Sequence, residues 1–217
     1  MEEPSSSDHL NSSMTDLMTS LMVIFILLLL VFVHRTAGQG PAITKLLIER
    51  LRHDMQVVNE ESIRPDGRDP NAILVIVPDR LMNFETGKST LRPEGEQFLK
   101  TFIPEFAEVL CSDQFRASIE SIVVEGHTDT HPYAGRTAEE SQNLNLKLSQ
   151  DRSMEVVKNA LSDLTGMEAK RGCFLEKLSA SGRGEQEQEA TPDESRRVIL
   201  KIRVKAGSVD SVRVAVP

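Results

Sequence analysis

The segment Leu17–Val33, LMTSLMVIFILLLLVFV, decides the class of this protein. Only Thr19 and Ser20 interrupt its apolar run. With the three residues before it, the run gives about 20 residues and roughly 30 Å of helix, which is enough to cross a bilayer. We therefore predict one N-terminal transmembrane helix at residues 14–35, preceded by a short tail at residues 1–13.

A cleaved signal peptide is the alternative interpretation of this run. The residues before it include Glu2, Glu3 and Asp8 but no Lys or Arg, and no small-residue cleavage site follows Val33. These features favour a retained anchor. The basic residues near the span, beginning with Arg35, all follow it, so the positive-inside rule taken alone places the C-terminal side in the cytoplasm.

Asp16 stands at the start of the span. A carboxylate that faces lipid costs a few kcal/mol, so it normally faces protein or water. Asp16, Thr19 and Ser20 share one helical face by their i, i+3, i+4 spacing. This face predicts an ion-carrying carboxylate, which needs a partner membrane protein because one acid in a single span forms no channel. The alternative is a helix N-cap at the membrane interface.

The overall charge excludes several functional classes. The 217 residues include 25 Lys and Arg against 33 Asp and Glu, a formal net charge of −8, so no basic stripe for nucleic acid is expected. The five His residues show no metal-ligand spacing, and no nucleophile–His–acid set is present. We therefore expect no metal, no cofactor and no enzymatic activity.

Residues 36–70 are predicted to form a stem or linker. Ile43, Leu47, Leu51, Met55 and Val58 recur every three or four residues, which predicts an amphipathic helix. We expect this stem helix to pack against a second copy of itself. A gating plug lying along the membrane is the alternative.

Residues 71–205 are predicted to fold as an α+β domain. Strands are expected at Ile73–Val77, Ile119–Val124, Leu175–Ser179 and Arg197–Val204, and helices at Gly95–Leu110 and Leu144–Leu164. The order β-α-β-α-β-β predicts a mixed sheet with helices on one face. Residues 206–217 form a C-terminal tail that frays or adds an edge strand.

Five motifs in this domain resemble, in order, those of the OmpA-like peptidoglycan-binding domain. They are NFETGKSTLRPEG (83–95), VVEGHTDT (123–130), NLKLSQDRS (145–153), SGRGE (181–185) and SRRV (195–198). The ligand of that family is the diaminopimelate of cell-wall stem peptides, which carries an amine and carboxylates. The resemblance implies that Asp129 and Arg152 hold these groups, with Thr128, Asn145 and Leu148 around them. A surface ion pair between Asp129 and Arg152 is the structural alternative.

The OmpA-like domain works in the periplasm, which implies a bacterial inner-membrane protein with a cytoplasmic N-terminus and a periplasmic C-terminal domain. Its two cysteines fit that compartment. Cys111 and Cys173 both stand at the ends of predicted elements, so they could meet in a disulfide. Two free buried thiols are the alternative.

The whole arrangement resembles the B subunit of MotAB-type ion-driven stators, with SxxTDLMTSLMVIF around Asp16. The resemblance implies a dimer of this chain inside a pentamer of a multi-span A subunit, driven by H⁺, with Na⁺ not excluded, and anchored to peptidoglycan. The short, acidic, Ser-rich N-terminal tail is more similar to the B subunit of the Zorya anti-phage motor. A flagellar stator subunit and a passive peptidoglycan tether are the alternatives.

Overall fold

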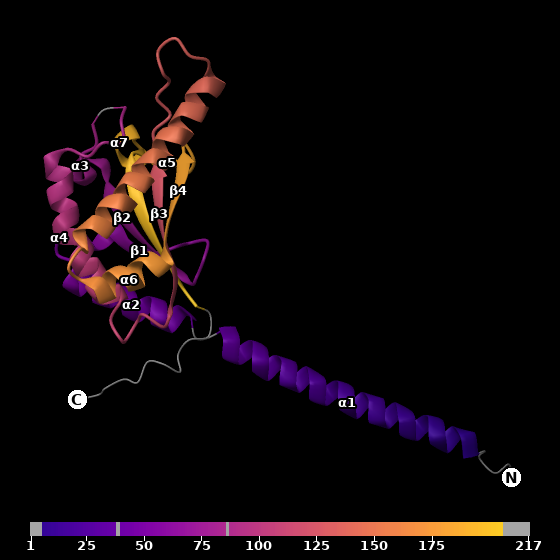
Figure 1. Ribbon diagram of the computed structural model, residues 1–217. Helices are drawn as coiled ribbons and strands as arrows, with labels where there is room; N and C mark the ends of the chain where they lie inside the picture. Colours follow the sequence, from indigo (N-terminus) through magenta and orange to yellow (C-terminus); the bar gives the residue numbers. More distant parts are fainter. Residues whose placement is uncertain (1–5, 38–39, 86, 206–217) are drawn as a thin grey trace.

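The computed structural model describes residues 6–37, 40–85 and 87–205. Helix α1 runs from Ser6 to Ala37 and contains a 20-residue apolar segment, Met14–Val33, with none of its residues buried. By length and composition this segment can cross a membrane. The helix begins earlier than predicted, because residues 6–13 of the expected tail belong to it (Figure 1). The predicted tail at 206–217 lies outside the described residues.

Five strands form one mixed sheet; the sequence predicted the mixed sheet and four of these strands, and it missed β1. They are β1 (Ile63–Pro65), β2 (Ala72–Pro78), β3 (Ile119–His127), β4 (Leu178–Gly184) and β5 (Arg197–Val204), in the spatial order β1-β2-β5-β3-β4. The β3–β4 pair is parallel, and the other pairs are antiparallel. Alternate residues of β5 face opposite sides of this sheet.

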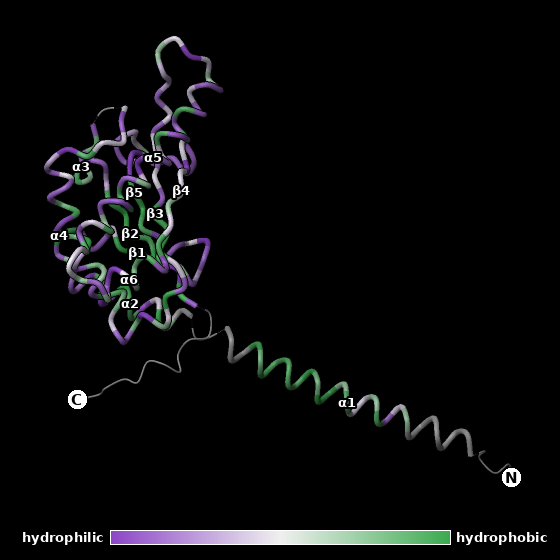
Figure 2. The backbone as a smooth tube through the Cα atoms, in the orientation of Figure 1, coloured by the Kyte–Doolittle hydropathy of each residue, from purple (hydrophilic) through white to green (hydrophobic). Residues whose placement is uncertain are grey.

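The larger helices cover one face of the sheet (Figure 1). The helices that follow α1 are α2 (Gly40–Asp54), the 3₁₀ turn η1 (Glu60–Ser62), α3 (Asp79–Met82), α4 (Pro93–Leu110), α5 (Ala138–Asp163), α6 (Glu168–Lys177) and α7 (Pro192–Ser195). Val198, Leu200 and Ile202 of β5 are buried in the core. Figure 2 shows hydrophobic residues concentrated along the inner strands and along α1.

The stem helix differs from the prediction. The apolar face of α2 carries Ile43, Leu47 and Leu51, which are almost fully buried in the same core as the sheet. Arg52 adds two hydrogen bonds to the carbonyl oxygen of Ile63, which lies on β1. The expected pairing of this face with a second copy is therefore wrong, because the domain of the same chain already covers it. The folded domain begins with α2 rather than at residue 71.

The predicted strand at Leu175–Ser179 is also corrected. Helix α6 continues to Lys177, and β4 begins only at Leu178. Cys173 and Phe174 are adjacent and both buried, whereas Leu175 is exposed. Two adjacent buried residues suit one side of a helix and break the alternation that a half-buried strand requires.

A disulfide joins Cys111, at the end of α4, to Cys173 in α6, and the two Cα atoms are 6.1 Å apart. The disulfide that the sequence allowed is therefore present, and the alternative of two free buried thiols is wrong. The bridge connects residues 62 positions apart. It ties the helical layer together at the end of α4.

Replacing both cysteines, Cys111→Ser with Cys173→Ser, is expected to lower the free energy of unfolding by about 4 kcal/mol. The reason is that a cross-link across a loop of this length removes entropy from the unfolded chain. Chemical denaturation of the full chain in mild detergent measures the change. Reductant should produce a similar loss in the native chain and none in the double variant; equal stability of oxidised and reduced native chain would contradict the prediction.

Candidate functional site

Glycines in the motifs allow α5 to lie directly on β3 and β4. A Cβ atom on Gly126 would be 2.2 Å from the carbonyl oxygen of Ser149, and one on Gly182 would be 2.6 Å from the amide nitrogen of Gln150. Two hydrogen bonds fix the approach, because the side chain of Gln150 accepts from the Gly182 amide and that of Ser149 accepts from the Gly184 amide. This contact positions the next turn of α5, which carries Arg152.

The guanidinium of Arg152 is held beneath the loop that follows α3. Its Nε donates to the carbonyl oxygen of Lys88 at 3.0 Å, and its Cζ lies 4.8 Å above the centre of the Phe84 ring. Its Nη1 lies 3.8 Å from a carboxylate oxygen of Asp79, beyond hydrogen-bond distance. Only 7% of the side chain is exposed. Among the described residues we find no further hydrogen bond of this guanidinium, so it retains N–H donors for a ligand.

Asp129 does not pair directly with Arg152 in the described part of the chain. Its Oδ2 accepts from Nη1 of Arg196 at 2.5 Å, and its Oδ1 accepts from the backbone amide of His131. Arg196 also lies near Asp79, at 3.9 Å. Asp129, Arg196, Asp79 and Arg152 thus form a row of alternating charges, which replaces the simple surface ion pair considered as an alternative.

Asp79 is the central carboxylate of this row. Burial raises the pKa of Asp79 above its ordinary value, while the neighbouring charges of Arg152 and Arg196 oppose that shift. The row therefore presents two guanidinium groups and two carboxylates at one end of the sheet. That combination can hold a ligand that carries both amine and carboxylate groups.

The other predicted site residues support this row from behind. Asn145 is buried, and its amide donates to Glu185 at 2.8 Å and lies 3.5 Å from the carbonyl oxygen of Asp129. Thr128 is also buried, and its backbone amide donates to the carbonyl oxygen of Gly184. Leu148 is half-buried on α5. Asn145 and Thr128 thus fix the loop that presents Asp129.

Sequence reasoning missed Asp79, Arg196 and Phe84 as members of the site. A signal for Arg196 was present in the SRRV motif, because the two adjacent arginines at the start of a strand must point to opposite faces of the sheet. Asp79 directly follows β2, and no sequence pattern connects it with α5. Only the folded sheet brings the two together.

The comparisons with known proteins agree with this geometry. The family model described as the OmpA family matches residues 83–199. The chain belongs to the OmpA family. This match includes all five site residues that the motifs predicted.

Similar proteins extend the comparison beyond the OmpA domain. Zorya protein ZorB of Escherichia coli is 25% identical over 206 residues, covering 88% of this chain and 86% of its own. A crystal structure of a putative MotB-like protein from Desulfovibrio vulgaris matches the fold with a TM-score of 0.54 and 20% identity, over 76% of this chain and 96% of that chain. The periplasmic domain of Helicobacter pylori MotB has a TM-score of 0.49 and 14% identity, over 69% and 83%. The chain is thus an OmpA-family protein that is similar to Zorya protein ZorB, and its domain shares the fold of the MotB-like protein.

The apolar helix α1 of this OmpA-family chain contains Asp16 well inside its length. Because α1 begins at Ser6, Asp16 lies in its third turn and is not an N-cap. The hydroxyl of Ser20 donates to the carbonyl oxygen of Asp16 at 2.5 Å, and that of Thr19 donates to the carbonyl oxygen of Thr15. Both hydroxyl protons are thus used within the helix, one turn from the carboxylate.

Metal ligation finds no support in the described part of the chain, where no three His, Cys, Asp or Glu side chains are grouped to hold an ion. His127, the histidine of the GHTD motif, is instead a buried structural group. Its Nδ1 lies 3.1 Å from the carbonyl oxygen of Gln186. Burial, together with the nearby charge of Arg197, lowers the pKa of His127 from 6.5 to about 4.

This pKa predicts a loss of stability in acid. Between pH 6.5 and pH 4 the unfolded chain binds a proton at His127 that the folded chain does not, so stability falls as the pH drops through that window. At pH 4.5 the loss from this group is about 2 kcal/mol relative to pH 8. Chemical denaturation of native and His127→Gln chains at the two pH values separates this effect from the titration of carboxylates distant from His127, which is the same in both chains. An equal drop in both chains would contradict the prediction.

Proposed function

We propose that this chain is the B-type subunit of an ion-driven, stator-like motor in the bacterial inner membrane. In this proposal the OmpA-family domain lies in the periplasm and binds peptidoglycan, while α1 spans the membrane with the N-terminus in the cytoplasm. The observation that carries the proposal is the arrangement at Arg152, whose nearly buried guanidinium keeps donors free beside the Asp79, Arg196 and Asp129 row. No step of chemical catalysis is assigned to the chain.

The site suits the diaminopimelate of a stem peptide. Arg152 would receive a ligand carboxylate on its remaining N–H groups, since Nε and the Phe84 ring already fix the guanidinium plane. Asp129 would accept from the ligand ammonium, because its two present partners leave lone pairs unused. Arg196 holds the carboxylate of Asp129 in place for this contact.

The membrane half of the proposal rests on Asp16. A carboxylate inside an apolar helix must face protein or water, which calls for a multi-span partner around α1. The hydroxyl protons of Thr19 and Ser20 are used within α1, so the carboxylate is the group left to take up and release H⁺. We propose that two copies of this chain stand within five copies of a MotA- or ZorA-like subunit, and that the similarity to ZorB favours anti-phage defence over motility.

Anchoring is tested with sacculi. Two variants, Arg152→Gln and Asp129→Asn, are each made in the full chain in mild detergent. Each is expected to weaken co-sedimentation with purified peptidoglycan about 30-fold or more, because it leaves one charged group of the bound stem peptide without its opposite charge on the protein. Arg136→Gln is the matched control, since Arg136 is an exposed residue that precedes α5 and pairs with Glu140. Unchanged sedimentation of both site variants would exclude wall binding at this row.

Ion coupling is tested at Asp16. Asp16→Asn is expected to abolish phage protection in cells that also produce the A-type partner, because the amide cannot carry a proton, while co-purification with that partner persists. Asp8→Asn, an acid outside the apolar segment, serves as the control. A passive tether is the second candidate function, and full protection by the Asp16→Asn chain would establish it in place of the motor.

A further inference from the structure

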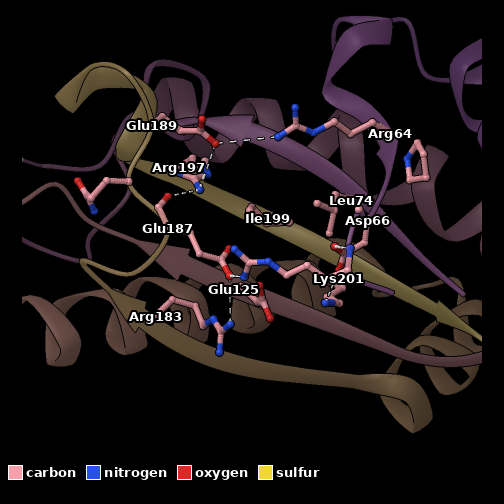
Figure 3. A pocket seen from close by; sticks show the side chains of 14 residues that line it. Arg64, Asp66, Leu74, Glu125, Arg183, Glu187, Glu189, Arg197, Ile199 and Lys201 are labelled. Atoms are coloured by element: carbon pink, nitrogen blue, oxygen red, sulfur yellow. Dashed lines mark hydrogen bonds and ion pairs between the residues drawn. The ribbon is translucent and has the colours of Figure 1, made fainter. Parts of the chain in front are cut away.

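The sheet face opposite α4 and α5 contains a charged cleft that wall anchoring does not use. It has a volume of about 590 Å³ and is lined by residues of all five strands and of the loops after β1 and β4 (Figure 3). Side chains of both charge signs point into it from opposite walls (Figure 3). Arg197 and Glu125 lie at its floor.

The strand register explains why this floor carries both signs. Arg196 points to the row at Asp129, so the next residue, Arg197, points to the other face of the sheet. His127 pairs with Arg197, and Glu125 pairs with Ile199, in the β3–β5 ladder. Glu125 and Arg197 are therefore two register positions apart on the same face, so an anion and a cation are diagonal neighbours on the sheet.

The cation end of the cleft has unused donors. The side chain of Arg197 is 4% exposed, and its Nη atoms donate to backbone carbonyl oxygens, including that of Glu187 at 2.8 Å. Its Nη2 also lies 3.4 Å from a carboxylate oxygen of Glu189, which lines the cleft. Its Nε is buried and has no hydrogen-bond partner within the described residues. The Nε of Arg183, which also lines the cleft, is likewise buried without a hydrogen-bond partner among the described residues, while its Nη2 lies 3.5 Å from a carboxylate oxygen of Glu187. A buried donor without a partner is unfavourable, so both atoms suit a bound oxyanion.

The anion end of the cleft has unused acceptors. The carbonyl oxygen of Gln186 can only accept, so the neutral ring of His127 donates from Nδ1 and presents a lone pair at Nε2. That Nε2 is buried without a partner, 3.9 Å from Glu125 Oε2. His127 Nε2 and Glu125 Oε2 are both acceptors, so a hydrogen-bond donor placed near them would satisfy both. Burial also raises the pKa of Glu125, which shows how poorly its charge is solvated.

We propose that this cleft is a second binding site, for a small zwitterion with an ammonium and a carboxylate group, as in a free amino acid. The carboxylate binds the Nε groups of Arg197 and Arg183, and the ammonium binds Glu125 with His127 behind it. The site lies on the opposite face from the peptidoglycan row, so it does not depend on the proposed function.

Calorimetric titration of the full chain in mild detergent with glycine tests this site. We expect saturable binding with a Kd of about 1 mM or tighter, since a few charge-assisted hydrogen bonds supply that affinity. Acetate and ethylammonium, which each carry only one of the two charges, should bind at least about 10-fold more weakly. Absence of saturable glycine binding, or equal binding of acetate, would overturn the proposal.

Variants assign the binding to the cleft. Glu125→Gln is expected to weaken glycine binding about 10-fold or more, because the amide removes the charge that holds the ammonium. Arg203→Gln, on the same strand but outside the cleft, should bind glycine like the native chain. Native affinity of the Glu125→Gln chain would refute the assignment.

Arg183→Gln provides the parallel test, because the Arg183 side chain is 35% exposed and tolerates replacement better than the buried groups. It should also weaken glycine binding about 10-fold or more, while sedimentation with peptidoglycan stays unchanged. Glycine affinity tests the cleft and sedimentation tests wall anchoring, so each proposal can fail without the other. Native glycine affinity in the Arg183→Gln chain would likewise refute the proposed contact.

Discussion

The close contact of α5 with β3 and β4 is the constraint on which the rest of the domain depends. Gly126 and Gly182 leave no room for a side chain between helix and sheet, and Ser149 and Gln150 accept hydrogen bonds from the backbone beneath them. The helix is therefore fixed in both distance and rotation. Arg152 follows two residues later, so its position at the end of the sheet is set by backbone packing rather than by its own ion pair.

Two adjacent arginines, Arg196 just before β5 and Arg197 at its first position, then divide the sheet into two chemical faces. Arg196 joins the carboxylates of Asp129 and Asp79, which are offered by segments that follow different strands. Arg197 enters the opposite face and is satisfied mainly by backbone carbonyl oxygens. Because neighbouring residues in a strand must point to opposite sides, one dipeptide contributes to two sites that cannot share a ligand.

The packing of α2 changes how the membrane half is understood. Its apolar face is buried against the domain, so the described chain offers no free stem there for pairing with a second copy. Assembly of two chains, as the stator proposal requires, must therefore use other surfaces. In α1, Asp16 lies in the third turn, so it cannot be the N-cap of this helix. Its carboxylate is carried by the interior of the helix rather than by its end.

Several features followed from the sequence alone, because each depends on local pattern. The apolar length of Met14–Val33, the alternation in Arg197–Val204 and the motif order predicted the span, a central strand and the OmpA-like domain. The strand prediction at Leu175–Ser179 began three residues too early, because α6 continues to Lys177 and no local pattern marks where this helix ends and β4 begins.

Tertiary structure alone decided what those local patterns contact. The face of α2 was recognised as apolar, but its partner was not, because a hydrophobic stripe does not specify which apolar surface will cover it. Likewise Asp79 joins Arg152 and Arg196 only because β2 and β5 pair in one register, and the disulfide forms because α4 and α6 meet. Sequence thus determined the elements and their chemistry. The fold decided the contacts between residues far apart in the chain, since these depend on packing geometry that no local pattern encodes.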